Sequence, residues 1–145
     1  MNYLRYAGIV IAVTLGLPIV LGLIAQVTGI NLSTAFVVIA PAIAAGMIEG
    51  QKFVAKTSRL PTGKETGAFV IFATLILVGF QALLTAAVIT NVAGYETLLI
   101  SPPSIWLIIG VVAFVTVAVA LCNWTFLRMG AKNQIKVLQR SGQPK

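Results

Sequence analysis

Carboxylates are the first candidates for chemistry in this sequence, and there are three of them: Glu49, Glu65 and Glu96. They stand on different segments, and the chain has no His and no Asp. The usual general bases and the usual ligands of haem and zinc are therefore missing. Cys122 is the only cysteine, which excludes an intramolecular disulfide. We expect no catalytic residue, no metal site, no cofactor and no enzymatic activity.

The thiol of Cys122 has two interpretations. Its position near the end of the last apolar run allows palmitoylation. A buried, inert thiol is the preferred interpretation, because free cysteines are among the residues most often buried in proteins.

Basic side chains gather in residues 49–65, whose sequence is EGQKFVAKTSRLPTGKE. This stretch separates two long apolar runs of the chain. Its excess of cations suits the docking of an acidic partner or an anionic lipid, with an aromatic ring as an apolar anchor. The alternative is a redundant signal that only orients the protein in a membrane. The candidate docking residues are Lys52, Phe53, Lys56, Arg59 and Lys64.

A second basic group follows the last apolar run, where cations recur every four residues. Residues spaced by four share one face of a helix, so the run predicts a helical extension with a basic face. Such a face attracts anionic lipid headgroups by about 1 kcal/mol for each cation. The alternative is a simple anchor for the last span. The four residues are Arg128, Lys132, Lys136 and Arg140.

A third candidate site is a polar layer near the middle of the apolar runs. Thr14, Gln81 and Thr116 fall at similar depth when residues are counted from the ends of the predicted helices, beside Pro18 and Pro41. Prolines that interrupt two helices at one depth occur at transporter sites. The preferred interpretation is ordinary helix packing with one interhelical hydrogen bond, because the layer has no ionisable residue.

The elements that would position these residues follow from hydropathy. Hydrophobic residues make up 59% of the chain and charged residues 9%, with a mean hydropathy of +1.01; soluble domains have about 25% charged residues. Apolar runs of membrane-spanning length recur. We predict an all-α membrane protein that forms one domain, 1–145, of four antiparallel transmembrane helices. The predicted spans are about 7–27, 33–54, 67–91 and 104–127.

The charges also predict the orientation. All ten Lys and Arg residues lie before the first span, in the loop at about 55–66 and its flanks, or in the tail at about 128–145. Cytoplasmic segments carry this excess, so we expect both termini in the cytoplasm of a bacterial cell, with the spans in its inner membrane. The net charge of +7 is distributed around the spans and does not indicate a nucleic-acid partner.

Several local contacts are predicted by spacing. Glu49 and Lys52 are three residues apart and are expected to pair. Thr62 and Glu65 have the spacing of a capping box. Ser101 is expected to cap the last helix, and Asn31 or Ser33 the second. Small residues that permit close helix approach form two stripes, Gly8, Ala12 and Gly16 in the first helix and Ala42, Ala45, Gly46 and Gly50 in the second.

Residues 41–46 (PAIAAG), 50–53 (GQKF) and 59–62 (RLPT), followed by Glu65, resemble the pattern of a family of small bacterial inner-membrane proteins with four spans. That family is uncharacterised. The resemblance implies the compartment and the number of spans, and it brings no catalytic or binding residues with it.

Two classes of function remain. The preferred one is a non-enzymatic accessory, assembly or protective subunit that binds another membrane component, either a membrane-protein partner or a further copy of itself. The alternative is a small transporter or channel that uses the polar layer around Pro18, Pro41 and Gln81.

Overall fold

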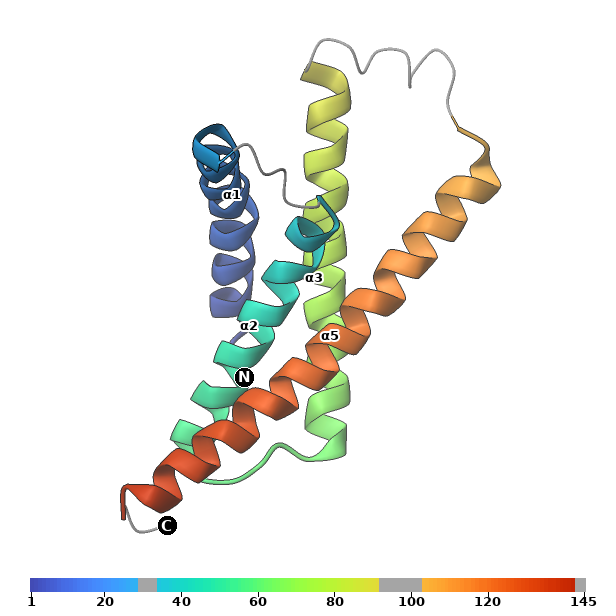
Figure 1. Ribbon diagram of the computed structural model, residues 1–145. Helices are drawn as coiled ribbons and strands as arrows, with labels where there is room; N and C mark the ends of the chain where they lie inside the picture. The colour runs from blue at the N-terminus through green and yellow to red at the C-terminus, as the bar shows by residue number, and fades with distance from the viewer. Residues whose placement is uncertain (29–33, 92–102, 143–145) are drawn as a thin grey trace.

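The computed structural model describes residues 1–28, 34–91 and 103–142, and all regular secondary structure in that part is helical. The helices are α1 (Tyr3–Thr28), α2 (Thr34–Thr57), α3 (Gly63–Asn91) and α5 (Ile105–Arg140) (Figure 1). Each of the four is long and apolar enough to cross a membrane. The prediction of an all-α protein with four helices of membrane-spanning length is therefore confirmed.

The helix boundaries extend beyond the predicted spans. α1 begins at Tyr3 and α3 at Gly63, because the polar turns that lead into the spans are already helical. α5 has 36 residues, about 54 Å at 1.5 Å per residue, and the basic tail forms its last turns. Its N-cap is Ser104, since the amide of Leu107 donates to the Ser104 Oγ at 3.4 Å. The predicted caps Asn31 and Ser33, like Ser101, lie outside the described residues.

The most extensive helix contact joins α2 and α5. A Cβ atom added at Gly50 would lie 2.9 Å from the amide nitrogen of Ala131 and still closer to the Leu127 carbonyl. One added at Gly130 would lie 2.9 Å from the Cα of Met47. Only glycine permits two backbones to approach so closely. Residue numbers rise together along this contact, so α2 and α5 run in the same direction.

The predicted small-residue stripe of α1 makes no such contact. A Cβ atom at Gly8 or Gly16 would meet nothing within 4 Å, and Ala12 is exposed. Within the described chain, no other helix uses the close approach that this stripe permits. The reason is that α1 packs through its opposite face, where Tyr6 and Val10 are buried.

The core lies where all four helices meet. The ring of Tyr6 on α1 packs edge-on against Phe69 on α3, with 5.4 Å between ring centroids, a favourable geometry for two aromatic rings. Small residues of α2 and larger side chains of α5 complete this core. Its buried members are Tyr6, Val10, Ala42, Ala45, Phe69, Ala73, Leu77, Val119 and Leu127.

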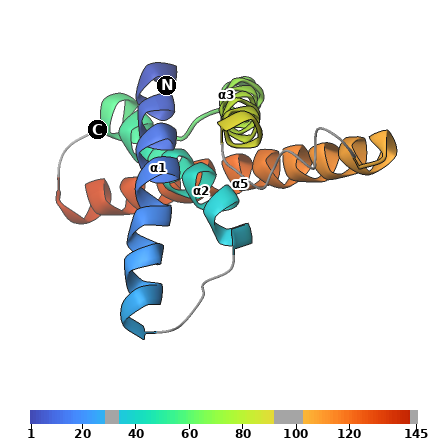
Figure 2. The same cartoon turned by 90° about the horizontal axis from the view of Figure 1, so that it is seen from above.

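Packing is confined to one half of the molecule. Figure 1 shows α3 and α5 separating toward the ends that lie away from the 58–62 turn, and Figure 2 shows α1 and α5 extending in different directions. All residues from Pro103 to Phe114 are exposed, as are most of those in the second half of α1. The N-terminal start of α1, the 58–62 turn and the end of α5 lie at the opposite, packed end, which we call the basic end because the described cations cluster there.

Candidate functional site

The first turn of α1 is held by Asn2. The Asn2 Oδ1 accepts hydrogen bonds from the amides of Leu4 at 3.1 Å and Arg5 at 3.2 Å. These are amides that a helix leaves without partners in its first turn, so Asn2 is the N-cap. The cap directs the backbone amide of Asn2 itself toward α2, where it donates to the Glu49 Oε2 at 3.0 Å.

Glu49 is the centre of the junction between α1 and α2. Its carboxylate is fully buried, with 0% exposure. The Arg5 guanidinium binds it in bidentate fashion, with Nε donating to Oε1 and Nη2 donating to Oε2 at 3.0 Å. A buried carboxylate is stable only when it is paired and hydrogen-bonded, and the planar guanidinium meets both needs at once.

The predicted pairing of Glu49 with Lys52 is wrong. Helical spacing places the two side chains near each other, but Glu49 turns into the helix junction and Lys52 is exposed. A flexible surface ammonium gains little from an exposed ion pair. Arg5 comes from another helix and supplies two directed hydrogen bonds inside the junction, so it is the stronger partner.

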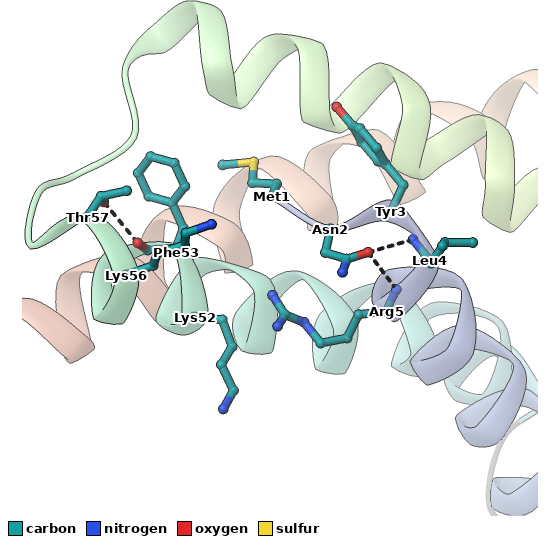
Figure 3. A pocket seen from close by; sticks show the side chains of 9 residues that line it. All are labelled: Met1, Asn2, Tyr3, Leu4, Arg5, Lys52, Phe53, Lys56 and Thr57. Carbon is teal, nitrogen blue, oxygen red and sulfur yellow. Dashed lines mark hydrogen bonds between the residues drawn. The ribbon is translucent and has the colours of Figure 1, made fainter.

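A cleft of about 590 Å³ lies between the start of α1 and the last turns of α2 (Figure 3). Neither Asp nor Glu lines it, and the Glu49 beside it already binds Arg5 and Asn2. The ammonium groups of Lys52 and Lys56 have no ion-pair partner in the described part of the chain. The cleft therefore carries uncompensated positive charge. Its lining residues are Met1, Asn2, Tyr3, Leu4, Arg5, Lys52, Phe53, Lys56 and Thr57.

The five predicted docking residues do not form one surface in the structure. Lys52, Phe53 and Lys56 line the cleft. Arg59 instead donates to both carboxylate oxygens of Glu65, at 2.8 and 2.7 Å, and these hydrogen bonds raise the pKa of Arg59. Lys64 is exposed at the start of α3 and lines none of the described cavities.

Arg59 and Glu65 belong to the turn between α2 and α3. The predicted capping box is present, since the Thr62 amide donates to Glu65 Oε2 at 2.8 Å and the Glu65 amide donates to Thr62 Oγ1 at 3.3 Å. The Arg59 guanidinium also lies 5.2 Å from the centre of the Phe53 ring. These contacts give Arg59 a structural role in the turn.

The basic tail lies on α5 as predicted, and its four cations are exposed. Arg128 and Lys132 lie near the 58–62 turn. Arg128 stacks over the Trp124 ring at 4.8 Å. Arg128 and Lys132 line a second cavity, of about 230 Å³, together with Leu60 and Pro61. Lys136 and Arg140 are exposed beyond it.

The three residues of the predicted mid-membrane layer are not joined by any hydrogen bond within the described residues. Thr14 is buried, and its hydroxyl has no partner there. The Thr116 hydroxyl donates to the Val112 carbonyl of its own helix at 2.7 Å. Gln81 lines an apolar cleft between α3 and α5. Pro18 is exposed, Pro41 is buried, and α1 and α2 continue through them.

A buried polar chain in the core was not predicted. The Tyr6 hydroxyl donates to the Asn123 Oδ1 at 2.9 Å, and the Asn123 Nδ2 donates to the Thr74 Oγ1 at 3.5 Å. The chain links α1, α5 and α3. The signal that could have indicated it is the carboxamide of Asn123 within an apolar span, where polar side chains face other helices. Its neighbour Cys122 is half-buried against the core.

Neither the carboxylates nor the thiol form a metal site in the described part of the chain, where no three His, Cys, Asp or Glu residues come together.

The fold defines a class of protein: an all-helical protein with four helices able to span a membrane. In comparisons with known proteins, no family model, curated protein or solved structure matches the chain. The resemblance to four-span inner-membrane proteins stays a prediction.

Proposed function

We propose that this chain is a non-enzymatic membrane subunit that acts by binding another membrane component, a transmembrane helix of a second protein. The observation that carries the proposal is the incomplete packing of the four helices. They meet around one core near the basic end, and the remaining halves of α1, α3 and α5 have mostly exposed apolar side chains.

The proposed docking surface is the cleft between α3 and α5, which has a volume of about 410 Å³. It lies in the half of the molecule where these two helices separate (Figure 1). Its lining is uncharged, which suits an apolar partner within a bilayer. The lining residues are Leu77, Val78, Gln81, Ala82, Thr85, Ala86, Ile89, Val111, Val112 and Val115.

The α3 wall of this cleft favours a helix as its occupant. Ala82 and Ala86 are one helical turn apart, with Thr85 between them, and all three line the cleft. Membrane helices associate through such small residues, because lipid supplies no hydrophobic drive and close backbone approach supplies dispersion energy. Gln81 offers one side-chain amide for a hydrogen bond across the same surface.

The proposal includes an orientation. We propose that the basic end faces the cytoplasm, in the inner membrane of a bacterium, with both ends of the chain on that side. The start of α1 with Arg5, the cations in and beside the 58–62 turn and the α5 tail lie toward one end, which supports this, since cytoplasmic segments carry such an excess. The four tail cations would then contact anionic headgroups.

Site-specific photo-crosslinking tests the docking surface. A photoreactive amino acid at Ala82 lies in the cleft, and the same amino acid at Leu75, an exposed residue of α3 outside the cleft, is the matched control. In intact membranes we expect position 82 to form an adduct with one membrane protein and position 75 to form none. Equal adducts at both positions, or no adduct at position 82, would remove the proposal.

The competing function, a small transporter or channel, has less support because Thr14, Gln81 and Thr116 are not linked in the described residues. The same experiment separates the two functions. An adduct between two copies of this chain at position 82 would favour a homodimeric transporter over a subunit of a larger assembly.

A further inference from the structure

The residues that line the cleft between α1 and α2, drawn in Figure 3, are of two chemical kinds. Lys52 and Lys56 are one helical turn apart on α2 and supply two free ammonium groups. Tyr3 and Leu4 of α1 supply apolar surface, and Leu4 is 86% exposed. A ligand that matches both kinds of residue has an anionic head and an apolar body.

The position of the cleft in the fold further limits which ligands could bind there. The candidate membrane-spanning helix α1 starts at Tyr3, and the candidate membrane-spanning helix α2 ends at Thr57. The cations that line the cleft, Arg5, Lys52 and Lys56, lie within the first two turns of α1 and the last two turns of α2. The cleft therefore lies where the apolar spans meet the polar surface, the depth at which the phosphates of a bilayer are found. Two lysines at that depth match a phosphate, and the exposed Leu4 matches the first methylenes of an acyl chain.

We propose that this cleft is a binding site for the headgroup of an anionic phospholipid. The ammonium groups of Lys52 and Lys56 donate to the phosphate oxygens, and the acyl chains leave along Leu4. Arg5 adds no net charge, because Glu49 neutralises it. The Arg5–Glu49 pair instead holds the start of α1 against α2 and so shapes the cleft. The site is independent of the helix-docking surface between α3 and α5.

Native mass spectrometry of the protein in a neutral detergent tests the site. Phosphatidylglycerol is titrated, and the affinity of the first bound lipid is measured for each variant. Lys52→Gln with Lys56→Gln is expected to weaken it about thirtyfold, because each cation near the surface contributes about a factor of five. Lys52→Arg with Lys56→Arg retains both charges and is expected to bind within a few fold of the unmodified protein.

The single variant Lys56→Gln is expected to weaken binding of the first lipid about fivefold. Its matched control is Lys64→Gln, which removes the same charge from an exposed residue outside the described cavities. Its first lipid is expected to bind within about twofold of the unmodified protein. An equal loss in this control would mean diffuse attraction to the basic end, and would overturn the proposal. Equal binding of zwitterionic phosphatidylcholine, or displacement of the lipid by millimolar inorganic phosphate, would overturn it as well.

Discussion

Arg5 of α1 donates two hydrogen bonds to the carboxylate of Glu49, a fully buried residue of α2 that is 44 positions away in the sequence. The Arg5 side chain is still 39% exposed. The two partners are therefore not equivalent. Removing Glu49 leaves a cation that water can solvate, whereas removing Arg5 leaves a buried carboxylate without a counter-charge.

This asymmetry predicts different costs for the two single substitutions. Arg5→Gln is expected to lower the free energy of unfolding by about 3 kcal/mol, and Glu49→Gln by about 1 kcal/mol. The double variant is expected to be more stable than Arg5→Gln alone, because the unpaired charge is gone. Equilibrium unfolding in mixed micelles with increasing SDS measures all three. Equal losses of stability in the two single variants would contradict the proposed asymmetry between Arg5 and Glu49.

A second prediction concerns the buried polar chain. Tyr6→Phe removes the donor to Asn123 and leaves its Oδ1 without that partner, so we expect a loss of about 1 kcal/mol in the free energy of unfolding. Tyr3→Phe is the matched control. The ring of Tyr3 also packs against Phe69, but its hydroxyl makes no hydrogen bond to the described residues. Equal effects of the two substitutions would mean that the hydroxyl of Tyr6 is not important.

The spans were predictable because bilayer thickness fixes the length of an apolar run, and the small residues Gly46 and Gly50 correctly indicated a close helix contact. Their partner was not predictable, since spacing within α2 says nothing about α5. Glu49 was assigned to Lys52 for the same reason: local spacing is visible in a sequence, and a partner such as Arg5 on another helix is not. Lys52 and Lys56 were expected at a docking surface, but the cleft that they line needs the start of α1.

The glycine contact between α2 and α5 gives a third prediction. Gly50→Ala places a methyl group against the backbone of Leu127 and Ala131. Backbone atoms cannot turn aside as a side chain can, so the helices must separate, and we expect a loss of about 2 kcal/mol or more. Gly79→Ala is the control, because a Cβ atom there meets nothing within 4 Å. It should leave stability unchanged or raise it by up to about 1 kcal/mol through better helix propensity. Unfolding in mixed micelles measures the stability of both variants. If Gly50→Ala causes no loss, α2 and α5 are farther apart than the structure shows.

The last prediction tests the orientation of the basic end. If this end faces the cytoplasm, a cysteine at Thr57 lies inside the cell, and one at Glu96, in the predicted external loop, lies outside it. Both are introduced with Cys122 changed to Ala, so that no native thiol reacts. An impermeant thiol reagent added to intact spheroplasts should label the variant at 96 and not the variant at 57. After the membrane is permeabilised, both variants should be labelled, which controls for thiol reactivity. Labelling of position 57 alone in intact spheroplasts would reverse the orientation, and would place the phospholipid cleft in the outer leaflet.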